Sequence, residues 1–249
     1  MKYGLTRCLA AWLPLAALFS CSKSNNPPGT ASLTIVNAVV GSTPLYTNFG
    51  GPQVLEWYSD AGGISFGNFE EFSSYSGHQP LALYPDTLAQ SVPLYNLTLT
   101  LPIGTIHSLF LTGTTSAPDT MTTVDTPPYH PASDSSMGIR FVNLSPGSAP
   151  VSVDIQGEAN GSEAASIPYK SITAFKNYPA TSAVSAYTFE FRDAASGALL
   201  ASASYTINAT SAAYLTNLLP YKNYTIALEG LPGVGTGATA QAAYVINNY

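Results

Sequence analysis

The sharpest candidate for catalytic chemistry is the segment Gly63 to Gly67 (GISFG), which fits the G-x-S-x-G pattern of a nucleophile elbow. Such an elbow holds its serine between a strand and a helix, and a histidine and an acid activate the hydroxyl. No helical pattern follows Ser65, so the simpler interpretation is a strand with turn glycines. A serine hydrolase using Ser65 stays open as an alternative.

The other chemistry-bearing residues do not form an obvious catalytic or metal cluster. His78, His107 and His130 show no H-x-H or H-x-x-x-H spacing. Glu70 and Glu71 are neighbours, and neighbours on a strand face opposite sides, so they cannot flank one bond. We therefore predict no metal, no cofactor and no enzymatic activity.

Aromatic side chains are the remaining candidates for binding. Trp57 and Tyr58 stand between Glu56 and Asp60 in the first half of the chain. Exposed aromatic rings are a common platform for sugars, whereas a buried Trp is common in the core of a sandwich. We expect whichever of the two faces solvent to contact a ligand.

The first residues predict a membrane address. Lys2 and Arg7 precede an apolar run, Cys8 to Phe19, that is too short to span a bilayer, and Ser20 then precedes Cys21. The sequence around Ser20 resembles the bacterial lipoprotein box, in which cleavage exposes a cysteine that is acylated. An ordinary secretory signal with a chance cysteine is the alternative. We predict lipidation of Cys21, the only cysteine left after cleavage, and anchoring in the outer membrane or at the cell surface, with the leaflet undecided.

Charge is scarce and unevenly distributed. The 249 residues carry a net charge of −6, and no Lys or Arg occurs between Lys23 and Arg140. Phosphate backbones require clustered Lys and Arg, so nucleic acid is excluded as a partner. The partners that remain are the membrane, through the anchor at Cys21, and a glycan or an envelope protein.

Two stretches of the chain repeat each other. Met137 to Gly157 aligns without a gap to Ala31 to Gly51, and Asn143 follows Asn37 by 106 residues. A period near one hundred residues indicates a duplicated small domain. The offset increases to 117 between Gly113 and Gly230, so the second copy contains longer loops.

Alternation of apolar and polar residues predicts strands throughout both copies. Apolar residues recur at every second position of 187–192, 199–207 and 95–101, and 107–113 and 224–230 form a matching pair of runs. Turn residues separate the runs every eight to twelve residues or so, which is typical of antiparallel sandwiches. The residues predicted for the core of the second copy are Phe141, Val153, Phe175, Phe189 and Tyr205.

We therefore predict an all-β fold of two tandem immunoglobulin-like antiparallel β-sandwiches. The predicted boundaries are a signal peptide at 1–20, a lipid-anchored tether at 21–30, a first sandwich at 31–124, a proline-rich linker at 125–136 and a second sandwich at 137–249. Three prolines stiffen the linker, so the sandwiches are expected to hold a limited range of angles.

The second copy resembles a known family. Arg140 to Pro146 (RFVNLSP), Ile167 to Tyr178 and Tyr224 to Ile226 look like the domain of unknown function 4397 family, and the first copy matches partially. The resemblance implies a secreted or lipid-anchored bacterial protein, often from Bacteroidota, with immunoglobulin-like repeats and no established catalytic residues. We expect a non-enzymatic binding, adhesion or spacer module, with a carbohydrate-binding surface lipoprotein beside a glycan importer as the alternative.

Two triplets resemble the Asp-Thr-apolar acceptor of periplasmic O-glycosylation in Bacteroidota. They centre on Thr87 (after Asp86) and Thr120 (after Asp119), and both are predicted to lie in polar loops. The alternative is a pair of Asp-led turns with nothing attached. We predict a glycan on at least one of these hydroxyls.

Overall fold

The computed structural model describes residues 29–52, 62–86, 91–207 and 217–248. Within these residues the chain forms β-strands joined by turns and loops, and contains no helix. The predicted all-β sandwich fold is confirmed. No helix long and apolar enough to cross a membrane occurs in these ranges.

The first half contains seven strands in two sheets, a four-stranded sheet of order β3-β1-β6-β7 and a three-stranded sheet of order β2-β4-β5. The strands are β1 (Thr30–Asn37), β2 (Tyr46–Asn48), β3 (Asn68–Tyr75), β4 (Gly77–Tyr84), β5 (Tyr95–Leu101), β6 (Ile106–Thr114) and β7 (Ala117–Asp125). Alternate residues of β5 point inward, as the period of two requires: Tyr95, Leu99 and Leu101 are buried, while Asn96, Thr98 and Thr100 are exposed.

The second half also forms two sheets, of orders β10-β9-β13-β14-β15 and β11-β8-β16-β17, with β12 pairing to β8. The strands are β8 (Ser136–Asn143), β9 (Val151–Ile155), β10 (Ala164–Ile167), β11 (Ser171–Ile172), β12 (Lys176–Pro179), β13 (Ala186–Asp193), β14 (Leu199–Ile207), β15 (Asn217–Leu218), β16 (Asn223–Glu229) and β17 (Ala242–Asn248).

The two halves repeat one pattern of strand pairing. β1 pairs parallel with β6 and antiparallel with β3, and β8 likewise pairs parallel with β16 and antiparallel with β11 and β12. The registers agree as well, because Leu33 pairs with His107 just as Ile139 pairs with Tyr224. The pairing of Ile167 in β10 with Val151 in β9 corresponds to the bridge between Ile64 and Leu45 in the first half. β15 has no counterpart among the described strands of the first half.

Each half encloses an apolar core between its two sheets. Of the predicted core residues, Phe141, Val153, Phe189 and Tyr205 are buried, and the rings of Phe141 and Phe189 meet edge to face at 5.2 Å. Phe175 was predicted wrongly. It is half-buried in the irregular segment between β11 and β12, and the Arg140 guanidinium lies 4.5 Å from its ring centroid. The error arose because the prediction extended strand periodicity across this segment.

The asparagine shared by the two copies forms the same structural hydrogen bonds in both halves. Asn37 and Asn143 are both fully buried. Each side-chain amide donates to a serine hydroxyl five residues on and to a distant isoleucine carbonyl, Ile64 in the first copy and Ile167 in the second. The pattern Asn-x-x-x-Gly-Ser therefore fixes a turn to the next part of the sheet.

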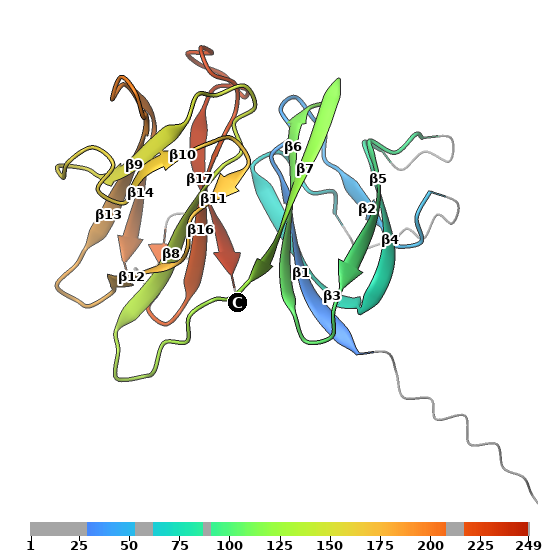
Figure 1. Cartoon of the computed structure of the whole chain (residues 1–249), viewed down its shortest axis with the longest axis horizontal. Helices are drawn as coiled ribbons and strands as arrows, with labels where there is room; N and C mark the ends of the chain where they lie inside the picture. The colour runs from blue at the N-terminus through green and yellow to red at the C-terminus, as the bar shows by residue number, and fades with distance from the viewer. Residues whose placement is uncertain (1–28, 53–61, 87–90, 208–216, 249) are drawn as a thin grey trace, which may run out of the picture.

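The two halves pack face to face through a third apolar core (Figure 1). The first half contributes Val36 and Phe110 from its four-stranded sheet and Ala38 directly after β1. The second half contributes Val142, Ala227 and Ile246 from sheet β11-β8-β16-β17 and Leu144 directly after β8. All seven side chains are fully buried. β1 and β8 are thus covered on both faces, and the two sandwiches form one packed body.

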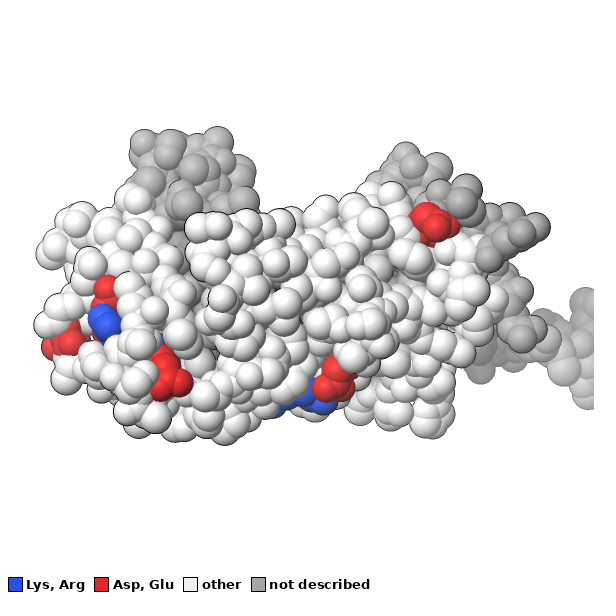
Figure 2. All heavy atoms as spheres, turned by 90° about the horizontal axis from the view of Figure 1, so that it is seen from above, with Lys and Arg blue, Asp and Glu red and all other residues white. Residues whose placement is uncertain are grey.

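A buried ion pair adds to this junction. Arg140 Nη1 lies 2.8 Å from Asp125 Oδ1, and both side chains are at most 5% exposed. β7 extends through Asp125, and the connector that follows is fixed by His130, which bonds Ser136 and Asn223 at 3.0 and 3.1 Å. Charge is otherwise sparse, and Figure 2 shows a mostly uncharged face with a few small charged groups.

Candidate functional site

Four of the sequence-predicted site residues lie outside the described ranges. They are Cys21, Trp57, Tyr58 and Thr87. Lipidation of Cys21, ligand contact by Trp57 or Tyr58, and glycosylation of Thr87 therefore stay predictions.

Ser65 lies in a turn that leads into a strand. Its side chain is exposed, its carbonyl accepts the amide of Asn68 at 3.0 Å, and β3 begins at Asn68. Gly67, with φ of 74°, allows the chain to make this turn. A nucleophile elbow requires a helix at this position, so the geometry is that of a strand-forming turn.

The three histidines lie in different places. His78 is exposed beside Thr100, His107 faces the interior of the first sandwich, and His130 is buried in the connector. No group of three or more His, Cys, Asp or Glu side chains suited to a metal ion occurs among the described residues.

The predicted loop around Thr120 is in fact a strand. Thr120 belongs to β7 and pairs with Leu111 of β6. Asp119 forms an ion pair with Lys170 at 2.7 Å, and this hydrogen bond lowers the pKa of the Asp119 carboxyl. Met121 packs against the third core. The sequence missed this strand because pairing with β6 and contact with the second half stabilise a polar run.

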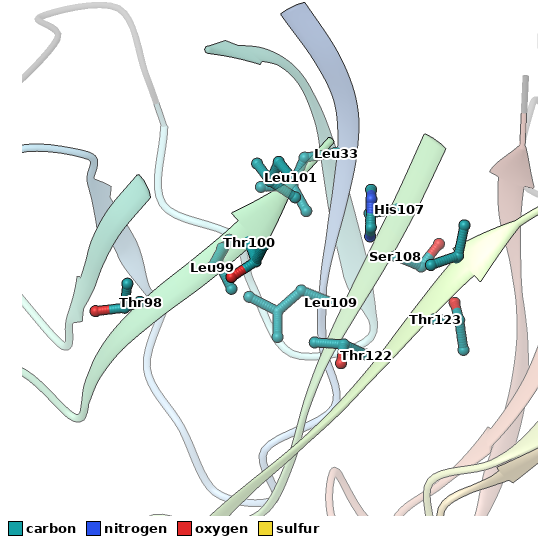
Figure 3. A pocket seen from close by; sticks show the side chains of 11 residues that line it. Leu33, Thr98, Leu99, Thr100, Leu101, His107, Ser108, Leu109, Thr122 and Thr123 are labelled. Carbon is teal, nitrogen blue, oxygen red and sulfur yellow. The ribbon is translucent and has the colours of Figure 1, made fainter. Parts of the chain in front are cut away.

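The most distinctive open feature of the first sandwich is a hollow of about 300 Å³ between β5 and β7 (Figure 3). We call it the β5–β7 hollow. The side chains of Leu33, Leu99, Leu101 and Leu109 form its apolar lining. The imidazole of His107 and the hydroxyl of Thr122, which pairs with Leu109, supply polar groups on the same side of their sheet. Thr98, Thr100 and Thr123 border the hollow, but the Thr100 hydroxyl contacts His78 and the Thr123 hydroxyl donates to Asp125. This mixture of an apolar surface with a few polar groups is typical of binding sites.

The hollow lies where two sheet edges face each other. β5 ends one sheet of the first half and β7 ends the other. In the second half the corresponding strands, β14 and β17, contact each other, and β15 continues the sheet beyond β14. Among the described residues, the equivalent edge is therefore covered in the second repeat and uncovered in the first.

Side-chain size also distinguishes the two edges. The pairing registers match Leu99 to Tyr205 and His107 to Tyr224. Both tyrosines belong to the core of the second half, so smaller side chains in the first half leave space there. The matching runs 107–113 and 224–230 already relate His107 to Tyr224 in the sequence, but the space depends on strands that are distant in the sequence.

A second hollow, of about 380 Å³, lies at the junction of the halves beside Arg140 and Phe175. Arg140 donates through Nη1 to Asp125 and through Nε to Thr225, each at 2.8 Å, while Nη2 is buried without a partner among the described residues. Since Asp125 already compensates the charge, this cluster serves the junction rather than an anionic ligand.

Glu229 is a second unusual group at the junction. It is 5% exposed, and its Oε2 has no hydrogen-bond partner among the described residues. Burial raises the pKa of its carboxyl to about 8. Its Oε1 lies so close to Gly67 that a Cβ there would come within 2.8 Å. The raised pKa favours the protonated carboxyl at neutral pH, and Gly67 of the first half lies directly against this side chain of the second half.

Comparison with known proteins gives little guidance. No family model and no curated protein matches the chain. One solved structure, described as "Alpha-glucan binding by a streptococcal virulence factor", shares 10% identity and covers 76% of this chain and 92% of its own, with a TM-score of 0.23. That TM-score is too low to support an inference about this protein.

Proposed function

We propose that this protein is a lipid-anchored envelope protein that binds a partner without transforming it, and that the β5–β7 hollow is its binding site. The observation that supports this proposal is the open edge itself. It combines an apolar lining with the Thr122 hydroxyl and one imidazole, and it is built on strands rather than on loops.

The packing of the two halves supports a presenting role. The third core and the pair between Asp125 and Arg140 join the sandwiches into one body, so the hollow keeps a fixed orientation relative to the second half. Attachment through acylated Cys21, ahead of the first sandwich in the sequence, holds this body at the membrane in the outer envelope. The protein thereby acts as a spacer as well as a binder.

Carbohydrate binding is the second candidate. The hydroxyl of Thr122 and the imidazole of His107 offer hydrogen bonds that sugars use. The described lining of the hollow is aliphatic, however, and lacks the aromatic platform on which sugar rings stack. An apolar side chain of a partner fits this lining better.

Photo-crosslinking in the native envelope tests the proposed function. Val124 lies at the hollow and is 64% exposed, and Asn247 is its exposed counterpart on β17. A photoreactive residue at Val124 is expected to give a discrete adduct that the same residue at Asn247 does not give. Equal or absent adducts at both positions would contradict the proposal.

The anchor and the ligand class have separate tests. Palmitate labelling of wild type and of Cys21→Ala is expected to differ, and equal labelling would exclude the lipid anchor. A glycan array probed with the mature chain tests the carbohydrate alternative. That alternative predicts binding to at least one glycan and loss of this binding in the Thr122→Trp variant.

A further inference from the structure

We propose that the β5–β7 hollow accepts an extended peptide segment of a partner protein, which adds to β5 as a parallel strand beside Thr100 and Leu101. The segment places one branched apolar side chain against the leucine lining. This inference rests on the proposed function and names the ligand class of the same site.

The second half of the chain shows how such a segment binds. β15 pairs parallel with the end of β14, Asn217 beside Thr206 and Leu218 beside Ile207. Leu218 is fully buried in the core of the second half. A two-residue strand therefore covers this sheet edge and fills the space below it with one leucine.

In the described part of the first half, no segment pairs with the same edge. The strand registers match Thr100 to Thr206 and Leu101 to Ile207, so corresponding residues at this edge differ in number by 106. His107 matches Tyr224, so the difference has increased to 117 at the next strand. All eleven extra residues (117 − 106) thus lie between β14 and β16. In the first half only residues 102–105 join β5 to β6, so this connection has no segment that could pair with β5 as β15 pairs with β14.

His107 occupies the position of a residue that binds the covering segment. Tyr224 accepts the backbone amide of Leu219 through its hydroxyl at 2.8 Å, directly after β15. His107 stands at the matched position, is 8% exposed and lines the hollow. His107 Nε2 bonds Thr105 Oγ1 at 2.8 Å, and the Thr105 hydroxyl itself donates to the Pro102 carbonyl, so Nε2 is the donor and Nδ1 is the acceptor. Nδ1 is therefore the nitrogen that accepts a backbone amide of a bound peptide.

Strand addition accounts for both affinity and selectivity. Main-chain hydrogen bonds to an open edge hold the peptide, and a pocket for alternate side chains selects it. A volume of about 300 Å³ suits a short segment with one buried side chain rather than a large ligand. Because no Lys or Arg occurs between Lys23 and Arg140, an acidic peptide would find no counter-charge in the first half. The expected partner sequence is apolar and neutral or basic.

The chain itself provides the probe. A fluorescein-labelled hexapeptide with the sequence of residues 215–220 (Leu-Thr-Asn-Leu-Leu-Pro) is titrated with the mature chain, and binding is followed by fluorescence anisotropy. We expect saturable binding, and at least tenfold weaker binding of the peptide that carries Asp in place of Leu218. Equal binding of both peptides, or of neither, would overturn the inference.

Two matched variants locate the site. Thr122→Trp fills the hollow and is expected to weaken peptide binding at least tenfold, while Asn96→Trp adds the same ring on the exposed face of β5 and leaves binding unchanged. His107→Tyr should retain the peptide and His107→Phe should weaken it. Thermal melts confirm that each variant is folded. Unchanged binding by folded Thr122→Trp would show that the peptide binds elsewhere, for instance by displacing β15, and would overturn the inference.

The outcomes separate this inference from the proposed function. A crosslink at Val124 combined with a glycan signal, and with no peptide binding, would leave a binding protein whose ligand is a sugar. Failure of both the crosslink and the peptide would remove the proposed function as well.

Discussion

Replacing Glu229 with Gln should make the protein more stable at high pH and leave it unchanged at low pH. The carboxyl has an ordinary pKa of 4.5 and a folded pKa of about 8, because burial penalises its charged form. Between these values the folded state binds a proton that the unfolded state releases, so stability decreases as pH rises from 4.5 to 8. At about 1.4 kcal/mol for each pH unit, the loss is about 3 kcal/mol at pH 7 and approaches about 5 kcal/mol above pH 8.

Urea unfolding at pH 5 and pH 8.5 measures this effect. The amide in Glu229→Gln is nearly isosteric and cannot ionise, so the variant should match wild type at pH 5 and exceed it by about 3–5 kcal/mol at pH 8.5. Glu158→Gln, in an exposed turn, is the control and should follow the wild-type profile. Parallel pH profiles for wild type and Glu229→Gln would refute the reasoning.

Three further predictions concern the core, the junction and modification. Phe189→Ala removes a fully buried ring and should lower the free energy of unfolding by about 3–5 kcal/mol in urea, whereas an unchanged midpoint would mean that the ring is not in the core. Asp125→Ala and Arg140→Ala should each lower the free energy of unfolding by about 3–5 kcal/mol, because each single change leaves a buried charge unpaired. The double variant should lose less than the sum of the two single losses, and strictly additive losses would contradict the pairing. Native protein should exceed the intact mass of the Thr87→Ala, Thr120→Ala double variant by a glycan, and a difference equal to the substitutions alone would exclude glycosylation.

The junction also changes the expectation for the two halves. A proline-rich connector alone would allow each sandwich to unfold separately. The third core buries Val36, Phe110, Val142 and Ile246 between the halves, and unfolding either half would expose them. We therefore expect the two sandwiches to stabilise each other.

The sequence determined the strands and their repetition, because these depend on local periodicity. The alternation in Tyr95 to Leu101 appears directly as β5, with Leu99 and Leu101 inward and Thr98 and Thr100 outward. The sequence also recorded the eleven extra residues of the second copy. It identified the shared Asn37 and Asn143 as a pattern, although the hydrogen bonds by which they hold the following turn are visible only in the structure.

The tertiary structure alone decided the hollow, the junction and the place of Phe175. Each depends on residues from distant parts of the chain. Arg140 meets Asp125 across the two halves, and Phe175 lies under Arg140 instead of in the core. Among the described residues no segment covers β5 beside the hollow, and this difference is visible only when the two repeats are compared as folded sheets. Periodicity specifies which side of a strand is apolar, but three-dimensional packing determines what covers that side.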